Sequence, residues 1–238
     1  MSGPTPPTHD PELIAYGGAF DPPHAGHVQM LQLALKRFPQ ALLYVLPAAQ
    51  PAVAGNGSKQ VCEDFSHRFA MAMEVFEAES PDRVKVLALE LELPKPNFTL
   101  NTLKRLAADY PSRRLGFLMG QDQLSSFPRW HEPMGILNLA DLIIVSRGQD
   151  EHAPPLDQAV EDMALKLNLK LAWSNGKARA DIATTGTALH LLPGNVCPAS
   201  STQLRSDLAA GRTPPQNWLP AATLNYLQKH QLYRKKKD

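Results

Sequence analysis

Residues 17–27 read GGAFDPPHAGH, and they directly follow the short apolar segment ELIAY at residues 12–16. A brief apolar run that meets two glycines is typical of a buried strand entering a tight turn. Apolar residues then recur at three- to four-residue spacing from Val28 to Phe38, which is the spacing of an amphipathic helix. The stretch therefore predicts a strand, a glycine-rich turn and a helix, in that order.

The same alternation of strand and helix patterns continues downstream. Further strands are expected at residues 41–46, 83–93, 114–119 and 140–146, a loop at 47–60, a helix with Phe65, Phe69, Met73 and Phe76 on one apolar face, and a helix at 99–110. Apolar runs that alternate with amphipathic helices are typical of right-handed βαβ units on a parallel sheet. We therefore expect an α/β fold with a Rossmann-like doubly wound parallel sheet, whose ligands gather beyond the carboxyl ends of the strands.

The two ends of the chain differ from this central part. Residues 169–173 and 187–192 are expected to be strands, and residues 200–211 and 221–233 are expected to form a small C-terminal helical subregion. Residues 1–11 contain four prolines and almost no large apolar side chains, so we expect a flexible leader there. Residues 12–238 are then expected to form a single domain with one large core.

Composition excludes several classes of protein. The 24 Lys and Arg residues nearly balance the 23 Asp and Glu residues, which gives a formal net charge of +1 at pH 7. Such a chain has no global positive field, so we expect neither nucleic acid nor a membrane as a partner. Cys62 and Cys197 lie far apart and form no CxxC pair, which favours a reduced, cytoplasmic setting. The sequence has no apolar run of about 18 residues and no signal-peptide pattern, which favours the same location.

The glycine-rich turn carries residues suited to phosphate binding. Gly17 and Gly18 have no Cβ atoms, so the backbone can come within hydrogen-bonding distance of a ligand. His24 and His27 stand where the helix begins, and a helix start offers unpaired N–H groups and the positive end of the helix dipole. Two imidazoles at such a point can both donate hydrogen bonds to one phosphate group. The arrangement suits phosphoryl or nucleotidyl transfer.

Other interpretations of the turn are less well supported. It is not a Walker P-loop, because no G-K-[ST] follows, and it is not the GxGxxG dinucleotide fingerprint. A histidine pair at this spacing can bind a metal, but no nearby cysteine or well-spaced carboxylate completes a ligand set. We therefore expect no metal ion held by the protein alone.

The turn resembles the signature of the nucleotidyltransferase superfamily with the (T/H)xGH motif, and its longer form is similar to that of the bacterial nicotinate-nucleotide adenylyltransferases. Five further segments resemble motifs of that family, in the family's order. They are His67-Arg68 with Met71, Phe98-Thr99-Leu100-Asn101-Thr102-Leu103, Gly120-Gln121-Asp122-Gln123-Leu124 with Trp130, Ser200-Ser201-Thr202-Gln203-Leu204-Arg205, and Tyr226 with Leu232-Tyr233. Six ordered motifs between residues 14 and 233 argue against a chance match.

The resemblance implies a reaction between two small-molecule substrates, ATP and nicotinate mononucleotide, which gives deamido-NAD and pyrophosphate, with Mg²⁺ carried on the ATP. It implies that His24 and His27 hold the ATP phosphates. It also implies that Arg205, with Ser201 and Thr202, grips the β and γ groups. The other implied contacts are Gly17, Gly18, Phe20, Asp21, Gly120 and Asp122 toward the nucleotide, and Lys59, Thr99 and Trp130 toward the mononucleotide.

Several alternatives stay open at this point. Asp122 can also be a helix cap, and Trp130 can also be a core residue. A sister nucleotidyltransferase acting on phosphopantetheine or glycerol phosphate shares the HxGH core, although Thr99, Trp130 and the H-R-x-x-M segment argue against it. A nucleotide-binding regulator that kept the fold is a further alternative. The sequence decides neither between nicotinate and nicotinamide mononucleotide nor between a monomer and a homo-oligomer.

Overall fold

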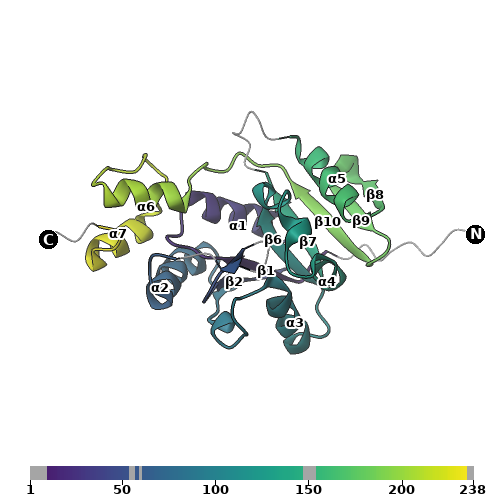
Figure 1. Ribbon diagram of the computed structural model, residues 1–238, viewed down its shortest axis with the longest axis horizontal. Helices are drawn as coiled ribbons and strands as arrows, with labels where there is room; N and C mark the ends of the chain where they lie inside the picture. The colour runs from purple at the N-terminus through teal and green to yellow at the C-terminus, as the bar shows by residue number, and fades with distance from the viewer. Residues whose placement is uncertain (1–9, 54–56, 59–60, 147–153, 235–238) are drawn as a thin grey trace, which may run out of the picture.

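A sheet of eight strands runs through the centre of the molecule, in the order β5-β2-β1-β6-β7-β10-β9-β8 (Figure 1). The computed structural model describes residues 10–53, 57–58, 61–146 and 154–234. Neighbouring strands from β5 to β10 are parallel, and β9 and β8 add an antiparallel edge. The strands are β1 (Leu13–Gly18), β2 (Leu42–Pro47), β5 (Val84–Val86), β6 (Leu115–Gly120), β7 (Ala140–Val145), β8 (Leu171–Ser174), β9 (Arg179–Ile182) and β10 (Thr187–Leu192), and β3 (Ala52–Val53) and β4 (Gly57–Ser58) form a separate two-stranded sheet.

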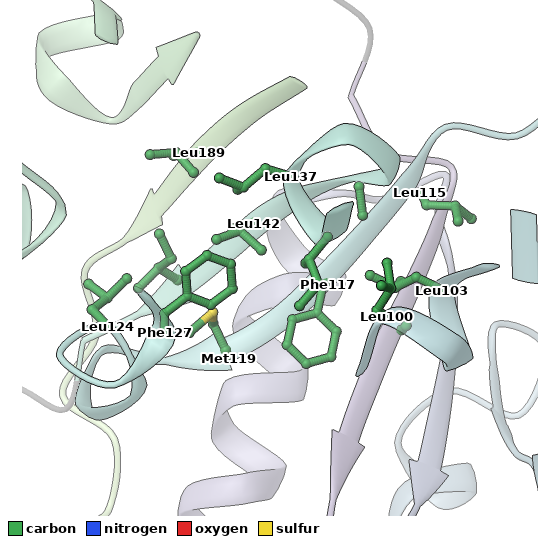
Figure 2. Packing of buried hydrophobic residues seen from close by; sticks show 14 of the residues in the cluster. Leu100, Leu103, Leu115, Phe117, Met119, Leu124, Phe127, Leu137, Leu142 and Leu189 are labelled. Atoms are coloured by element: carbon green, nitrogen blue, oxygen red, sulfur yellow. The ribbon is translucent and has the colours of Figure 1, made fainter. Parts of the chain in front are cut away.

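Helices cover both faces of the sheet, so the central strands β6 and β7 are buried along their whole length. On one face, α1 and α2 pack against strand residues such as Ile14 and Val45. On the other face, α3 and α4 pack around Phe117 and Leu142 (Figure 2), and α5 adds Val160 and Met163 to the same cluster. The helices are α1 (Ala25–Arg37), α2 (Phe65–Phe76), α3 (Thr99–Asp109), α4 (Pro133–Leu139), α5 (Leu156–Lys166), α6 (Ser201–Ala209) and α7 (Ala221–His230), with single 3₁₀ turns η1 (Glu77–Glu79), η2 (Leu89–Leu91), η3 (Gln121–Gln123), η4 (Phe127–Arg129) and η5 (Asn175–Lys177).

The strand order reverses between β1 and β6, because β2 and β5 lie on one side of β1 whereas β6, β7 and β10 lie on the other. β1 and β6 pair only from Leu13 to Ala15, although β1 continues to Gly18 and β6 to Gly120. The two strands therefore separate toward their carboxyl ends. A reversal of this kind is where ligands bind in open α/β sheets, so the fold directs attention to the loops after Gly18 and Gly120.

The structure confirms the predicted doubly wound α/β fold, although its sheet is mostly rather than wholly parallel. The predicted C-terminal helices are present as α6 and α7, which lie at the same end of the molecule as α2 (Figure 1). Three elements that the sequence analysis did not predict are α4, α5 and β9, and the predicted loop at 47–60 contains the short strands β3 and β4. No helix in the described part of the chain is long and apolar enough to cross a membrane.

Two details of the prediction were wrong. The expected strand at 83–93 is a strand only at Val84–Val86, and it is followed by η2, in which the adjacent residues Leu89 and Glu90 are both buried. The chain turns here instead of continuing as a strand, and both side chains of this pair face the interior. The expected apolar face of α2 is also displaced, because Met73 is 40% exposed while Arg68 and Met71 face the core.

The start of the described chain is anchored to the domain. Asp10 forms an ion pair with Arg37 at 2.7 Å, and Pro11 packs against Gly116. The rest of the predicted leader, residues 1–9, lies outside the described residues. The assignment of residues 12–238 to one domain stays a prediction.

Candidate active site

His24 and His27 form a reciprocal cap at the start of α1. The backbone N–H of His24 donates to Nδ1 of His27 at 3.2 Å, and the backbone N–H of His27 donates to Nδ1 of His24 at 3.4 Å. The two rings stack with their centroids 3.6 Å apart. Because each Nδ1 accepts a hydrogen bond, each neutral ring carries its proton on Nε2. The cap therefore fixes both imidazoles side by side as N–H donors, as phosphate binding requires.

Close approaches around this cap explain why the turn is rich in glycine. A Cβ atom on Gly26 would lie 2.6 Å from the carbonyl oxygen of Cys197, so a larger residue would push the chain before α6 away from α1. A Cβ atom on Gly18 would lie 2.8 Å from the ring of Phe20. Phe20 itself is 1% exposed, with its ring edge-to-face against His27 at 5.1 Å between centroids. The Phe20 side chain is buried against the His27 ring, so only the backbone of Phe20 can touch a ligand.

Asp21 ties the turn to distant parts of the chain. Its carboxylate accepts hydrogen bonds from the backbone N–H groups of Cys62 at 2.7 Å and Glu63 at 3.3 Å, and from the hydroxyl of Tyr233 at 2.6 Å. Burial, followed by the hydrogen bond to Asp21 and its charge, raises the pKa of Tyr233 far above its usual range, so this hydroxyl remains a donor. Asp21 is 2% exposed, and its carboxylate serves as a structural junction.

The start of α6 docks on the same turn. Arg205 donates from Nη1 to the backbone oxygen of Asp21 at 2.7 Å and from Nη2 to Thr202 Oγ1 at 3.3 Å. Ser201 donates from Oγ to the backbone oxygen of Pro22 at 3.0 Å. These bonds bring the N-terminus of α6 to the loop that leads into α1. Two helix starts, each with the positive end of its dipole, therefore meet beside the histidine pair.

Arg68 on α2 is a buried hydrogen-bond donor to the backbone of the turn. It is fully buried, and it donates from Nη1 to the backbone oxygen of Ala19 at 2.7 Å and from Nε to that of Glu63 at 3.1 Å. Burial lowers the pKa of Arg68, and the negative charge of Asp21 is the main influence that opposes this. Arg68 belongs to the His67-Arg68 motif, but its role was not predictable from the sequence, because its partners Ala19 and Glu63 lie outside α2.

Thr99 and Trp130 lie on neighbouring segments. Thr99 is the first residue of α3, and Phe98 before it stacks on His131 with 4.3 Å between ring centroids. Trp130 is partly buried, and its indole N–H donates to Ser126 Oγ at 3.2 Å. The structure therefore brings both predicted mononucleotide contacts to one region. His131, next to Trp130 in the chain, joins the two segments through this stacking.

The other predicted site residues are distributed around this region. Gly120 ends β6 and is the cap residue of η3, so Asp122, which follows within η3, is not the cap. Asp122 is exposed and accepts a hydrogen bond from Gln123 Nε2 at 2.6 Å. Gly17 and Gly18 are partly exposed at the end of β1. Lys59 lies outside the described residues.

A buried polar network far from the turn was not predicted. Asp141, the second residue of β7, accepts hydrogen bonds from Arg114 Nη2 at 2.6 Å and from the backbone N–H of Ala188 at 2.9 Å, and it lies 3.0 Å from His190 Nε2. Although burial acts to raise it, the hydrogen bonds from His190 and Arg114 hold the pKa of Asp141 below its usual value. The only sequence signal was an aspartate inside an apolar strand, at the amino end of β7 rather than at the carboxyl end, where the site lies.

Comparison with known proteins identifies the family of the chain. The family described as "Cytidylyltransferase-like" matches this chain over residues 15–206. The chain is 31% identical over 229 residues to a probable nicotinate-nucleotide adenylyltransferase of Stenotrophomonas maltophilia, covering 93% of this chain and 96% of that protein. It is 28% identical over 222 residues to a protein of the same name from Gemmatimonas aurantiaca, covering 93% and 92% of the two chains.

A solved structure of similar fold is the Plasmodium falciparum nicotinic acid mononucleotide adenylyltransferase complexed with NaAD. Its TM-score is 0.66 at 17% identity, and the alignment covers 93% of this chain and 96% of that one. This likeness supports the fold. Because the family match runs from β1 through the histidine turn to the first residues of α6, and the Stenotrophomonas maltophilia protein is similar along nearly the whole chain, this chain belongs to the cytidylyltransferase-like family and, within it, to the nicotinate-nucleotide adenylyltransferases.

Proposed function

We propose that this protein transfers the adenylyl group of ATP to nicotinate mononucleotide, which gives deamido-NAD and pyrophosphate in NAD biosynthesis. The observation that carries the proposal is the stacked pair of His24 and His27 at the start of α1, beside the start of α6. Two aligned imidazole donors between two helix starts suit a polyphosphate. The names of the relatives support nicotinate mononucleotide as the acceptor.

In the proposed reaction, a phosphate oxygen of the mononucleotide attacks the α-phosphorus of ATP in line. The new oxygen–phosphorus bond forms while the bond between the α-phosphorus and the oxygen bridging to the β-phosphate breaks. Pyrophosphate leaves with that electron pair. No protein nucleophile is needed, so the residues of the chain act by positioning the substrates and by stabilising the developing charge.

Three side chains are assigned to this charge. His24 and His27 donate from Nε2 to the ATP phosphates, and the hydrogen bonds at Nδ1 keep the rings in that orientation. Arg205 grips the β and γ groups that leave as pyrophosphate. Its hydrogen bond to the backbone of Asp21 holds the guanidinium against the turn before substrate arrives, which reduces the entropy lost on binding.

The remaining residues of the proposed site are assigned either to the nucleotide or to the mononucleotide. Gly17, Gly18 and Gly120 let the backbone approach the nucleotide, and Asp122 accepts hydrogen bonds from ribose hydroxyls. The further nucleotide contacts are the backbone of Phe20 and Asp21 and the hydroxyls of Ser201 and Thr202. Thr99, Trp130 and Lys59 are assigned to the mononucleotide, with the indole of Trp130 offering a stacking face to the pyridine ring.

We propose that the metal enters as MgATP. Mg²⁺ keeps several waters and is usually held by one or two carboxylates together with substrate phosphates. The carboxylate of Asp21 is already bonded to Cys62, Glu63 and Tyr233, and no group of three or more metal-ligating side chains occurs in the described ranges. This donor set fits an ion carried by the nucleotide. When bound there, Mg²⁺ neutralises charge on the pyrophosphate.

We also propose a cytoplasmic location with small molecules as the only substrates. Cys62 and Cys197 are both free thiols, which is usual in a reducing compartment. ATP and nicotinate mononucleotide are both soluble metabolites, so the reaction needs neither a membrane nor a nucleic acid.

The test is an assay of pyrophosphate release from MgATP with each acceptor in turn: nicotinate mononucleotide, nicotinamide mononucleotide and phosphopantetheine. We expect turnover with nicotinate mononucleotide, with deamido-NAD as the second product. Turnover with phosphopantetheine alone would replace the proposal with the sister activity. Binding of ATP with no turnover on any acceptor would instead indicate a nucleotide-binding regulator.

A further inference from the structure

A buried carboxyl group lies behind the segment that carries Thr99. Glu90, in η2, is 5% exposed, and its Oε1 accepts a hydrogen bond from Thr102 Oγ1 at 2.8 Å. Its backbone oxygen accepts another from Asn97 Nδ2 at 2.9 Å. Thr102 stands three residues after Thr99 on α3, so both lie on the same side of the first turns of that helix. Glu90 therefore fixes the orientation of the helix face that presents Thr99.

Asn97 extends this attachment to the loop after β2. Its Oδ1 accepts a hydrogen bond from the backbone N–H of Gln50 at 2.7 Å, and its own N–H donates to the backbone oxygen of Gln50 at 2.9 Å. The loops after β2 and β5 both leave the carboxyl edge of the sheet. The carboxyl group of Glu90 thus holds α3 through Thr102. Its backbone oxygen holds Asn97, which in turn holds the loop after β2.

Arg68 is a second buried charged residue, of opposite sign, that acts electrostatically on Glu90. Arg68 Nη2 and Glu90 Oε2 are both fully buried, and neither has a hydrogen-bond partner among the described residues. Each charge favours the ionised form of the other, since Arg68 acts to lower the pKa of Glu90 and Glu90 acts to raise that of Arg68. Arg68 Nη1 also donates a hydrogen bond to the backbone oxygen of Ala19, in the turn at residues 17–27, at 2.7 Å. The two buried charges therefore act on each other electrostatically, Glu90 behind the segment that carries Thr99 and Arg68 behind the turn at residues 17–27.

We propose that Glu90 is a positioning residue for the mononucleotide: its ionised carboxyl group holds the start of α3 through Thr102, and its backbone oxygen holds the Asn97 loop, on the side of the site that faces the Arg68-supported turn at residues 17–27. The inference rests on the proposed function. Glu90 touches neither substrate, yet the affinity of the site for the mononucleotide depends on its buried charge.

The charge of Glu90 changes in the neutral range. Burial raises the pKa of Glu90 to about 7, against the hydrogen bond from Thr102 and the attraction of Arg68. The groups that face it are Arg68 from α2 and the hydroxyl of Thr102 from α3. Glu92, two residues further on, pairs with Arg105 at the surface at 3.0 Å instead. As the pH rises through about 7, Glu90 gains its charge and attracts Arg68, so the KM for the mononucleotide should fall.

The experiment compares wild type with Glu90→Gln, and uses Glu92→Gln as the matched control. Glu92 carries the same charge in the same segment, but its side chain is 61% exposed. The KM values for nicotinate mononucleotide and for MgATP are measured from about one unit below to one unit above pH 7. For wild type and Glu92→Gln we expect the mononucleotide KM to fall about fivefold over this range, with little change for ATP. For Glu90→Gln we expect it to stay at the high value throughout.

A second variant and a binding measurement keep the test independent of folding and of turnover. Thr102→Val removes a hydrogen bond that favours ionised Glu90, so the midpoint of the KM profile should move to higher pH. Titration calorimetry with nicotinate mononucleotide in the absence of ATP should give the same order of affinities. Equal pH profiles for wild type and Glu90→Gln, or equal changes in both KM values, would overturn the inference. If wild type neither binds nor converts the mononucleotide, the proposed function itself fails.

Discussion

Replacing Glu90 by glutamine is expected to stabilise the protein at alkaline pH. Burial raises the pKa of Glu90 from 4.5 to about 7, although Thr102 and Arg68 act to lower it. Between these two values the folded protein holds a proton that the unfolded chain has lost. Stability falls with rising pH wherever the folded state binds more protons. The contribution of Glu90 is therefore fully present below pH 4.5 and is lost as the pH rises to about 7.

The size of the effect follows from the shift. At ~1.36 kcal/mol per pKa unit, a rise from 4.5 to about 7 corresponds to about 3 kcal/mol. Glutamine keeps an oxygen for Thr102 but does not titrate. The free energy of unfolding of Glu90→Gln should therefore match that of wild type near pH 4.5 and exceed it by about 3 kcal/mol at about pH 8.

Urea unfolding at both pH values, followed by circular dichroism, measures this difference. Subtracting the wild-type value from that of the variant removes the contribution of the other titrating groups. Glu92→Gln should show no such rise, because its carboxyl group is exposed. A stability difference that is the same at both pH values, or that favours wild type at high pH, would refute the argument that the charge on Glu90 is costly. A variant that is more stable but binds the mononucleotide less well would show that the charge is retained for binding.

Further predictions concern the turn and its supports. His24→Ala should lower turnover at least about 10²-fold, the equivalent of ~2.7 kcal/mol of transition-state stabilisation, whereas His67→Ala, whose ring contacts Tyr226, should leave turnover nearly unchanged; steady-state kinetics of both variants checks this. Trp130→Ala should raise the KM for the mononucleotide far more than the KM for ATP, and equal increases would remove the indole from the mononucleotide side. Tyr233→Phe should lower the free energy of unfolding by about 1.5–3 kcal/mol, because the buried Asp21 carboxylate loses a donor; an unchanged urea midpoint would contradict this.

Local signals made part of this structure predictable. The strand, turn and helix around residues 17–27 were predicted because glycines, helix-start residues and apolar spacing all act within a few positions of one another. The start of α6 was predicted for the same reason. Interactions over a longer range were not predictable. The hydrogen-bond partners of the Asp21 carboxylate are Cys62, Glu63 and Tyr233. Nothing in the sequence near residue 21 indicates that these residues contact it.

The wrong strand at 83–93 shows a second limit. Alternating Leu and Glu residues from Leu89 to Leu93 have the period of a half-exposed strand, and the sequence offers no reason to turn Glu90 inward. The structure does so because the Thr102 hydroxyl, later in the chain, donates to the Glu90 carboxyl group. Asn97, from the same later segment, donates to the Glu90 backbone oxygen. A buried acidic residue that supports a site looks like a surface residue until its partners are known.

The near-zero net charge of the chain is compatible with a polyphosphate site because the cations near the turn are matched by buried anions. Arg205 Nη1 lies 3.7 Å from the carboxylate of Asp21, and Arg68 is attracted by both Asp21 and Glu90. The attraction for phosphate must then come mainly from directed donors, namely the backbone N–H groups at two helix starts and the imidazoles of His24 and His27. Directed donors act at short range and only in the right geometry. A chain with a net charge of +1 can therefore hold several phosphates in one place while exerting no general attraction for polyanions.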